Sequence, residues 1–461
     1  MSRAKQVITC KAAVCWGLGK PVTVEEIQVD PPKAKEVRVK MLCSSVCHTD
    51  ISSLKGFPHN QFPLALGHEG IGVVESIGDQ VTNLKEGDFI IPTYIGECEE
   101  CENCVSGKTN LCLTHPVRLT GLMPDNTSRL SVRGQTLYHV LSCASWSEYV
   151  VVDINYLLRV DPNINLAYAS FISCGFSTGY GACWKEANIE SGSTVAVFGL
   201  GAVGLGAISG AKMMGASKII GVDKNEMKRE KGEAFGMTHF INSNDSDKSA
   251  SELVKELNGM GVDYCIECTG VAPLLTESLE ATKMGTGKAI AVGIGAELVV
   301  PFGLLAIQFG RTLKGSVFGG IKAKSDLTTI ANKCQKQEFP LHELFTHEVP
   351  LVDIDKAFEL LKDPTCVKVV IKILSPHLLF QQAICPRFRR SSTYIRELHA
   401  ITTAVKKWRQ YLLGHPFVIF TDHQSLNELL TQVIQSPEQQ IYLAKLMGYD
   451  YSIHTNLAKQ M

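Results

Sequence analysis

The feature that most constrains the fold of this chain is a loop with four cysteines. The stretch CEECENCVSGKTNLC places Cys98, Cys101, Cys104 and Cys112 at C-x2-C-x2-C-x7-C spacing. Four thiolates on one glycine-containing loop can surround a single ion tetrahedrally and leave no open position, as structural zinc requires. An iron–sulfur cluster also takes four thiolates, but nothing else in the chain indicates electron transfer. The loop therefore predicts a structural zinc site.

Cysteine usage and charge limit the class of protein. Several of the 16 cysteines stand at metal-ligand spacing, so we interpret them as ligands and buried thiols, not disulfides. The N-terminal residues are polar, which predicts no signal peptide, and no run of about 18 apolar residues predicts a membrane span. We therefore expect a cytoplasmic protein. The net charge of −1 gives no general reason to expect nucleic acid or a membrane as partner.

Three further segments offer ligands for a second metal ion. VCHTD, GHEGIG and ISCGFSTGYGA contain Cys47, His68 and Cys174, beside glycines or small polar residues. Two thiolates and one imidazole form the ligand set of a catalytic zinc, whose fourth position stays open for water or substrate. Each segment alone is weak evidence for a metal site, because a lone cysteine or histidine is usually only a packed side chain. Together with the four-cysteine loop they predict a catalytic zinc site.

The middle of the chain contains a dinucleotide-binding pattern. In TVAVFGLGAVGLGAISGAKMMGASKIIGVD, an apolar run over 194–198 leads into a G-x-G-x-x-G turn at the start of a predicted helix. The glycines of this turn are Gly199, Gly201 and Gly204. They allow a pyrophosphate to approach the N–H groups of the helix N-terminus. A second predicted strand, over 218–222, ends at Asp223. Its carboxylate can bind ribose hydroxyls and would repel a 2′-phosphate, which favours NAD over NADP.

Over residues 1–373 these motifs resemble the zinc-dependent medium-chain alcohol dehydrogenases, in particular the plant and animal branch with two zinc ions per subunit. The resemblance implies an α/β fold, with a β-rich GroES-like catalytic domain and a Rossmann doubly wound parallel sheet. It assigns the catalytic zinc to Cys47, His68 and Cys174, and the structural zinc to the four-cysteine loop. It also implies a homodimer, formed through strands around GKAIAVGIGAELVV and RTLKGSVFGG.

The resemblance implies roles for further residues. Glu69 matches an acid beside the metal, and Asp50 matches the carboxylate that orients the zinc-bound imidazole. Thr49 matches the hydroxyl that hydrogen-bonds the alcohol oxygen and passes its proton outward. The implied coenzyme contacts are Lys228 at the adenosine ribose, Val292 behind the nicotinamide, and His48 and Lys368 at the pyrophosphate.

The implied reaction is reversible hydride transfer between a primary or secondary alcohol and NAD. In several relatives a histidine three residues after the Thr49 position completes the proton relay, but this chain has Ser52 there. His48 is a candidate substitute. Family alignment places Tyr94, Val140 and Leu141 around the inner pocket.

The substrate is constrained by what the sequence lacks. Relatives that oxidise the glutathione adduct of formaldehyde carry an acid near the Phe57 position and an arginine just after the fourth structural cysteine. Gly56-Phe57-Pro58 contains no acid, and Arg118 lies six residues past Cys112. We therefore expect an aliphatic or aromatic alcohol or aldehyde.

From residue 374 the sequence changes character. Residues 374–461 carry nine Lys or Arg and five Asp or Glu, a net charge of +4, so the preceding residues carry −5. Apolar residues from Leu398 through Trp408 to Leu412 recur at helical spacing, which predicts an amphipathic helix ended by Gly414. A strand over 417–421, a helical stretch over 438–447 and a strand in YDYSIHT follow.

This C-terminal segment, 391–455 at least, resembles the ribonuclease H domain of gypsy-type retrotransposon polyproteins. STYIRELHAITTAVKKWRQYLLGHPFVIFTDHQSL and QQIYLAKLMGYDYSI carry the resemblance. Such enzymes hold two magnesium ions with four acids, of which Glu397 and Asp422 match two. The segments for the other two are missing, which also deprives the 417–421 strand of sheet neighbours. We therefore expect an inactive fragment, and weak nucleic-acid binding through its basic residues is the alternative.

These patterns predict a domain organisation. The catalytic domain spans 1–177 plus 320–373, the NAD-binding Rossmann domain 178–319, a linker 374–390, and an incomplete α/β ribonuclease H-like appendage 391–461. The leading hypothesis is a zinc- and NAD-dependent alcohol dehydrogenase that acts on a small-molecule alcohol or aldehyde, with nucleic acid an improbable partner. The competing hypothesis is an inactive or misassembled fusion product whose tail disturbs dimerisation.

Overall fold

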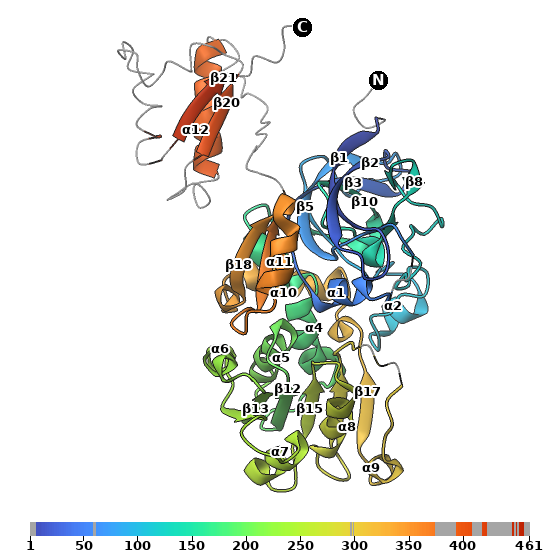
Figure 1. Cartoon of the computed structure of the whole chain (residues 1–461), viewed down its shortest axis with the longest axis vertical. Helices are drawn as coiled ribbons and strands as arrows, with labels where there is room; N and C mark the ends of the chain where they lie inside the picture. Colours follow the sequence, from blue (N-terminus) through green and yellow to red (C-terminus); the bar gives the residue numbers. More distant parts are fainter. Residues whose placement is uncertain are drawn as a thin grey trace. The chain divides into compact units, whose positions relative to one another are not determined.

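The chain divides into two compact units, Met1–Leu374 and Ser375–Met461 (Figure 1). The computed structural model describes residues 6–58, 61–295, 297, 299–373, 393–407, 417–421, 445–446, 449 and 451–455. Within these residues, no helix has both the length and the apolar composition needed to cross a membrane.

The outer segments of the first unit form two β-sheets. One sheet has the strand order β8-β7-β2-β1-β4-β9, and the other has the order β11-β6-β5-β3-β19-β18 with β10 paired to β3. The first consists of β1 (Ile8–Cys15), β2 (Val22–Val29), β4 (Leu64–Ala65), β7 (Leu130–Val132), β8 (Gln135–Thr136) and β9 (Tyr138–His139). The second consists of β3 (Glu36–Ser45), β5 (Glu69–Ile77), β6 (Phe89–Pro92), β10 (Tyr149–Asp153), β11 (Leu157–Val160), β18 (Phe345–Pro350) and β19 (Lys368–Lys372). Because β19 pairs with β3, this sheet combines strands from the beginning and the end of the unit.

The third sheet is parallel throughout and lies between these outer segments in the sequence. Its order is β14-β13-β12-β15-β16-β17. The strands are β12 (Thr194–Phe198), β13 (Lys218–Asp223), β14 (His239–Asn242), β15 (Tyr264–Glu267), β16 (Lys288–Ala291) and β17 (Thr312–Gly315). Strands such as TVAVF are continuous apolar runs because helices cover both faces of a parallel sheet. The direction of strand progression reverses at β12, so the carboxyl ends of β12 and β15 flank the crevice where such sheets bind nucleotides.

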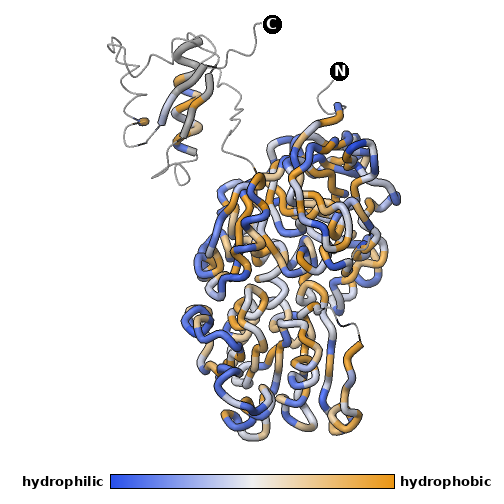
Figure 2. The backbone as a smooth tube through the Cα atoms, in the orientation of Figure 1, coloured by the Kyte–Doolittle hydropathy of each residue, from blue (hydrophilic) through white to orange (hydrophobic). Residues whose placement is uncertain are grey.

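The helices of this unit are short and connect the strands. In Figure 2, hydrophobic stretches of the backbone alternate with hydrophilic ones throughout the unit. They are α1 (His48–Leu54), α2 (Glu102–Ser106), α3 (Leu166–Ile172), α4 (Gly175–Gly181), α5 (Ala202–Met213), α6 (Arg229–Phe235), α7 (Ala250–Asn258), α8 (Ala272–Glu280), α9 (Leu304–Gln308), α10 (Ser325–Gln335) and α11 (Ile354–Leu360). The strands predicted over 194–198 and 218–222 are both present, and the second extends to Asp223.

Helices α4 and α5 pack through glycines. A Cβ on Gly179 would lie 1.7 Å from the Val203 carbonyl oxygen, and one on Gly206 would lie 2.2 Å from the Phe176 carbonyl oxygen. Only glycine permits this approach. Since α4 begins directly after Cys174, the packing of these two helices fixes the position of that cysteine.

The second unit contains α12 (Thr393–Lys407) and a parallel pair of strands, β20 (Phe417–Thr421) and β21 (Tyr451–Thr455). Val405 and Leu446 are buried against Ile401, Tyr449 and Tyr451. The expectation that the 417–421 strand lacks sheet neighbours is wrong in one respect, because β20 pairs with β21 along its full length. Several of the features expected in this unit lie outside the described residues: Asp422, Trp408, Leu412, Gly414 and nearly all of the helical stretch over 438–447.

Candidate metal centres and coenzyme site

Three separate segments bring Cys47, His68 and Cys174 together. Cys47 is the residue before α1, His68 precedes β5, and Cys174 precedes α4. Their ligand atoms, with one oxygen of Glu69, all lie within 4.8 Å of one another. The Nε2 atom of His68 is buried and has no hydrogen-bond partner among the described residues. An unpaired buried imidazole nitrogen between two thiols fits a zinc site with an open position.

The Asp50 carboxylate orients the His68 ring. Both side chains are fully buried, and Asp50 Oδ1 lies 3.0 Å from His68 Nδ1. The same carboxylate accepts hydrogen bonds from the backbone N–H groups of Cys47 and Gly67, both at 3.1 Å. A carboxylate at Nδ1 holds the proton there, so the lone pair of Nε2 points toward the two sulfurs.

Glu69 forms a buried ion pair with Lys368. Its other carboxylate oxygen accepts a hydrogen bond from Gly175 N at 3.1 Å, and Ser45 donates to the paired oxygen. Burial raises the pKa of Glu69 to about 7, against the opposing charge of Lys368. The Lys368 ammonium also donates to the Val46 carbonyl oxygen at 3.1 Å and is nearly fully buried, so here it faces Glu69, not an open coenzyme cleft.

The two thiols of the three-ligand site differ in acidity. A hydrogen bond with Cys174 is the main cause that holds the pKa of Cys47 well below its usual range, and the charges of His68 and Lys368 add to it. Cys174 carries the complementary shift, with its pKa raised. One of the two sulfurs is therefore readily available as a thiolate, the form that binds metal.

Two of the residues expected to handle the alcohol, Thr49 and Tyr94, lie beside this group. The Thr49 hydroxyl oxygen lies 3.9 Å from Cys47 Sγ, whereas His48 is exposed at the first position of α1. Tyr94, Val140 and Leu141 are all buried. The Tyr94 ring meets the His68 ring edge-on, with 5.7 Å between centroids.

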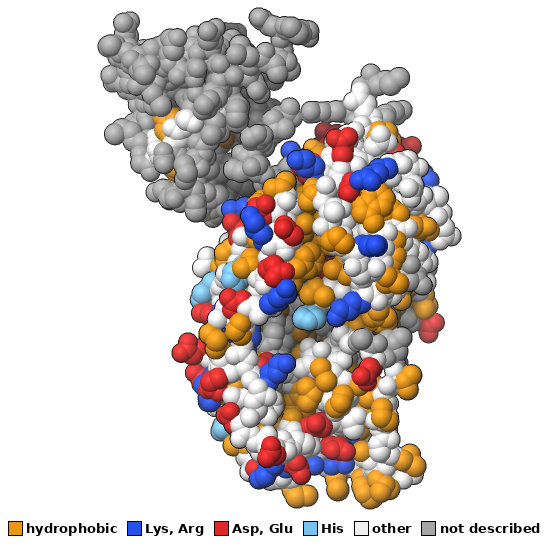
Figure 3. Space-filling model, viewed as in Figure 1, with side chains coloured by type: hydrophobic (Ala, Val, Ile, Leu, Met, Phe, Trp, Pro, Cys, Tyr) orange, Lys and Arg blue, Asp and Glu red, His pale blue; other side chains and the backbone are white. Residues whose placement is uncertain are grey.

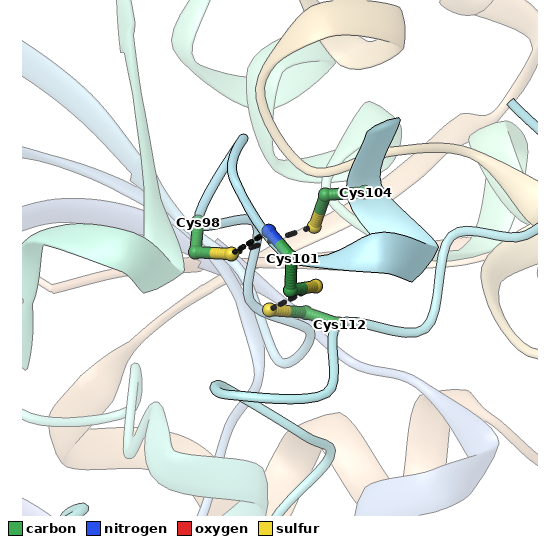
Figure 4. A group of neighbouring side chains, drawn as sticks. All are labelled: Cys98, Cys101, Cys104 and Cys112. Atoms are coloured by element: carbon green, nitrogen blue, oxygen red, sulfur yellow. Dashed lines mark hydrogen bonds between the residues drawn. The ribbon is translucent and has the colours of Figure 1, made fainter. Parts of the chain in front are cut away.

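The four cysteines of the 98–112 loop converge on one point (Figure 4). Cys98 Sγ lies 3.8 Å from Cys104 Sγ, and Cys101 Sγ lies 3.9 Å from Cys112 Sγ. Four sulfurs at the zinc–thiolate distance of about 2.3 Å form a tetrahedron with edges of about 3.8 Å. The observed spacing matches that tetrahedron and is far longer than a disulfide bond.

Backbone N–H groups point at the sulfurs of this loop. Cys101 N donates to Cys98 Sγ at 3.2 Å, and His115 N donates to Cys112 Sγ at 3.2 Å. Hydrogen bonds, chiefly with Thr114, lower the pKa of Cys98 to about 5. These hydrogen bonds favour the thiolate at Cys98, whereas burial raises the pKa of Cys104 to about 12.

The glycine turn after β12 has the geometry of a phosphate-binding turn. Gly199 has a φ of +86°, and a Cβ on Gly204 would lie 1.8 Å from the Gly199 carbonyl oxygen. A Cβ on Gly201, by contrast, would meet nothing within 4 Å. The space beside Gly201 at the N-terminus of α5 is open to a ligand, as a pyrophosphate requires.

Three other expected coenzyme residues follow or end strands of this parallel sheet. Asp223 ends β13 and accepts a hydrogen bond from Leu200 N at 2.8 Å, which ties it to the glycine turn. Val292 is buried and follows β16. Lys228 is also mostly buried, and its ammonium donates to the Cys366 carbonyl oxygen at 2.7 Å. Burial lowers the pKa of Lys228. Its amine is already paired with a backbone oxygen, which a bound ribose would have to replace.

Sequence reasoning did not single out several groups around the three-ligand site. Ser45 bonds Glu69, Phe318 packs against Tyr94, and the buried Thr178 hydroxyl has no hydrogen-bond partner among the described residues. Thr178 stands in ISCGFSTGYGA, four residues after Cys174. In a helix, this spacing places two residues on the same face, so the sequence could have indicated that Thr178 lies near the ligand.

In the second unit, Glu397 lies within α12, and Asp422 lies outside the described residues.

Comparisons with known proteins agree with these arrangements. Residues 33–162 match the alcohol dehydrogenase GroES-like domain, 202–335 the zinc-binding dehydrogenase family, and 380–449 the RNase H-like domain found in reverse transcriptase. The last match begins inside the stretch expected to be a linker over 374–390.

Full-length relatives cover the first unit. The chain is 57% identical over 375 residues to the "CYP enzymes assisting alcohol dehydrogenase" of Catharanthus roseus, covering 80% of this chain and 100% of that protein. It is 56% identical over 374 residues to alcohol dehydrogenase 1 of Artemisia annua, covering 80% and 99%.

Among solved structures, benzyl alcohol dehydrogenase from Acinetobacter calcoaceticus superposes with a TM-score of 0.73 at 28% identity, over 80% of this chain and 100% of that one. From family models, full-length relatives and fold together, we conclude that this chain belongs to the zinc-binding alcohol dehydrogenase family, followed by a C-terminal RNase H-like segment.

Proposed function

We propose that this protein oxidises alcohols, and reduces the corresponding carbonyl compounds, with zinc and NAD as cofactors. The observation that carries the proposal is the buried, unpaired Nε2 of His68, which lies with the Cys47 and Cys174 sulfurs within 4.8 Å. In this proposal the four-cysteine loop holds a second, structural zinc. When bound, the catalytic zinc supplies Lewis acidity toward the alcohol oxygen, and NAD accepts the hydride.

The chain's own residues then position the substrate and move its proton. The Thr49 hydroxyl, close to Cys47, accepts the alcohol proton and passes it outward. Asp50 keeps the His68 ring in one tautomer, and Glu69 supplies a charge that Lys368 balances. Because Ser52 replaces a relay histidine, and His48 is exposed, the proton leaves to water or through His48.

The coenzyme preference follows from the acid at the end of β13. The Asp223 carboxylate, held by Leu200 N, offers its remaining lone pairs to the ribose hydroxyls and repels a 2′-phosphate. Lys228 and Lys368 reach the ribose and the pyrophosphate by exchanging their present partners, the Cys366 carbonyl oxygen and Glu69. Val292, buried after β16, is assigned to the space behind the nicotinamide ring.

The substrate proposed is a neutral primary or secondary alcohol with an aliphatic or aromatic group. Tyr94, Val140, Leu141 and Phe318 are buried apolar or aromatic side chains, and Gly56-Phe57-Pro58 offers no acid for a charged substrate. One structural relative is a benzyl alcohol dehydrogenase, which supports an aromatic substrate.

A homodimer and a cytoplasmic location complete the proposal. Strand β17 stands last in the order of the parallel sheet, and large hydrophobic side chains near it are exposed. They include Val299 (86% exposed), Leu304 (68%), Leu305 (61%) and Phe309 (51%). Figure 3 shows hydrophobic side chains gathered where α9 lies. An apolar patch beside a sheet edge is suited to a second copy of the same chain.

The test is NADH formation at 340 nm over a panel of aliphatic and aromatic alcohols, with NADP as the alternative coenzyme. We expect turnover with NAD, loss of turnover after a zinc chelator, and recovery on adding zinc back. A His68→Ala variant should bind the four-cysteine zinc and lack activity. Absence of a chelator-sensitive signal with every alcohol would refute the proposal.

The RNase H-like segment gives a second candidate function, weak nucleic-acid binding, which its match at 380–449 and its net positive charge favour. Salt-sensitive binding of an RNA–DNA hybrid by the full chain, absent from residues 1–374, would support it.

A further inference from the structure

Tyr94 touches two of the three proposed zinc ligands. Its hydroxyl oxygen lies 3.7 Å from Cys174 Sγ, and its ring meets the His68 ring edge-on at 5.7 Å. Phe318 packs against the same ring, with 5.2 Å between centroids and an interplanar angle of 68°. With only 8% of its surface exposed, Tyr94 is held in place and its hydroxyl is shielded from bulk water.

The protonation state of Cys174 decides which atom of this pair donates. A thiol can donate its proton to the phenol oxygen, but a thiolate has no proton to give. Zinc binds cysteine as the thiolate. In the metal-bound site the Tyr94 hydroxyl is therefore the donor, and the Cys174 sulfur accepts.

We propose that Tyr94 is a positioning residue of the metal centre, whose hydroxyl donates a hydrogen bond to the sulfur of the metal ligand Cys174. Hydrogen bonds to a charged acceptor are stronger than neutral ones, particularly in a buried site. The bond withdraws electron density from the thiolate, so the sulfur gives less charge to the ion and the ion polarises the alcohol oxygen more strongly. This inference rests on the zinc site of the proposed function.

A phenylalanine at this position would keep the ring and lose only the donor. Because the contacts with His68 and Phe318 are made by the ring, Tyr94→Phe should leave the packing unchanged. Substituting a residue that hydrogen-bonds a metal ligand typically lowers metal affinity or activity by about 10–100-fold. We expect the lower end of this range for Tyr94→Phe, because only one hydrogen bond to sulfur is lost.

The experiment replaces the catalytic zinc of the full chain with cobalt(II) and records the thiolate-to-cobalt charge-transfer band. Without the hydrogen bond the sulfur lone pair lies higher in energy, so Tyr94→Phe should move the band to longer wavelength. The same variant should lower kcat about tenfold, with a smaller change in KM.

Tyr156→Phe is the matched control. Tyr156 is also buried, but its hydroxyl donates to the Pro116 carbonyl oxygen at 2.8 Å and not to a proposed ligand of the catalytic metal. Its cobalt band should coincide with that of the unmodified protein. An unshifted band in Tyr94→Phe, or an equal shift in Tyr156→Phe, would overturn the role of Tyr94.

The unmodified protein separates failure of this inference from failure of the proposed function. If it takes up no cobalt at the three-ligand site, the zinc proposal itself falls. Should Tyr94→Phe not accumulate as folded protein, the cobalt–sulfur stretching frequency of the unmodified protein can be compared in H2O and D2O. A shift on exchange supports a hydrogen bond to the ligand sulfur, and an unchanged frequency refutes it.

Discussion

The Asp50 carboxylate accepts hydrogen bonds from three groups at once and is fully buried. An asparagine in its place has the same shape but presents an N–H that can face the imidazole, which favours the wrong tautomer of His68. We predict that Asp50→Asn lowers the zinc affinity of the three-ligand site and kcat/KM by about 10–100-fold. Atomic absorption and initial rates measure the two effects.

Asp263→Asn is a control for this substitution, because Asp263 binds Thr194 and Lys283 far along the chain from the proposed ligands. It should leave the zinc content unchanged. Equal zinc loss in both variants would show that Asp50 has only a structural role.

Asp223 supports a prediction on coenzyme choice. Replacing it with serine removes the charge that repels a 2′-phosphate but leaves a small polar side chain beside Leu200 N. We predict that Asp223→Ser raises KM for NAD about tenfold, a loss typical of charged hydrogen bonds of about 1.5 kcal/mol, and allows measurable turnover with NADP. Steady-state kinetics with both coenzymes check this, and an unchanged NAD-to-NADP ratio would contradict the assignment of Asp223.

At the scale of secondary-structure elements, the α4–α5 contact links the proposed coenzyme turn to the proposed metal ligand Cys174. Gly206→Ala would place a methyl group 2.2 Å from the Phe176 carbonyl oxygen and force the helices apart. We predict a loss of about 1–3 kcal/mol in the free energy of unfolding, with weaker zinc binding because α4 begins at Cys174. Urea unfolding and zinc titration measure these quantities.

Gly201→Ala should behave in the opposite way. Its added Cβ meets no protein atom within 4 Å but occupies the open space at the start of α5. Stability should be unchanged while KM for NAD rises. If the two glycine variants lose stability equally, the distinction between packing and ligand approach is wrong.

A partly buried charge network joins β3 to the 125–129 segment and makes stability depend on pH. Arg129 forms ion pairs with Glu36 and Asp125, and Asp125 forms a second ion pair with Lys33. Burial alone would raise the pKa of Asp125, but hydrogen bonds from Lys33 and Arg129 hold the pKa below its usual range. Because the folded pKa is the lower one, the ionised form stabilises the fold above about pH 4, and that contribution is lost as pH falls toward the folded pKa.

We predict that Asp125→Asn lowers the free energy of unfolding at pH 7 by less than about 1 kcal/mol, because more than a third of the side chain is exposed and solvent screens the pair. The deficit should be constant from pH 5 to 8 and shrink below about pH 4. Urea unfolding across this range measures it, with the exposed Asp79→Asn as control. A deficit that grows on acidification would contradict the sign.

The elements of this fold differ in how far the sequence determines them. Continuous apolar runs such as Thr194–Phe198 can be recognised because a parallel strand is buried on both faces. The glycine turn and the four-cysteine loop are local, so spacing alone predicts them. The Glu69–Lys368 pair and the Lys228 contact with Cys366 are not visible in any local pattern, since they join residues that only the folded sheets bring together.

At the scale of the whole molecule, the two compact units match different protein families. The relatives from Catharanthus roseus and Artemisia annua are matched along 100% and 99% of their own length, although each match covers only 80% of this chain. The residues proposed to bind zinc and the coenzyme all lie within Met1–Leu374. The first unit therefore contains every group that the proposed reaction uses.

The last prediction concerns where the chain can be shortened. Residues 1–374 keep β19, whose Lys368–Lys372 pairs with both β3 and β18, so the second sheet stays complete. Residues 1–366 lose β19 and with it the partner of Glu69. We predict that 1–374 folds, forms the same dimer and keeps kcat/KM within about twofold, an energetic change under about 0.5 kcal/mol, whereas 1–366 does not fold. Size-exclusion chromatography and NADH formation test both. If 1–374 is inactive while the full chain turns over alcohol, the RNase H-like segment contributes to the enzyme. If 1–374 forms dimers and the full chain does not, the segment obstructs assembly.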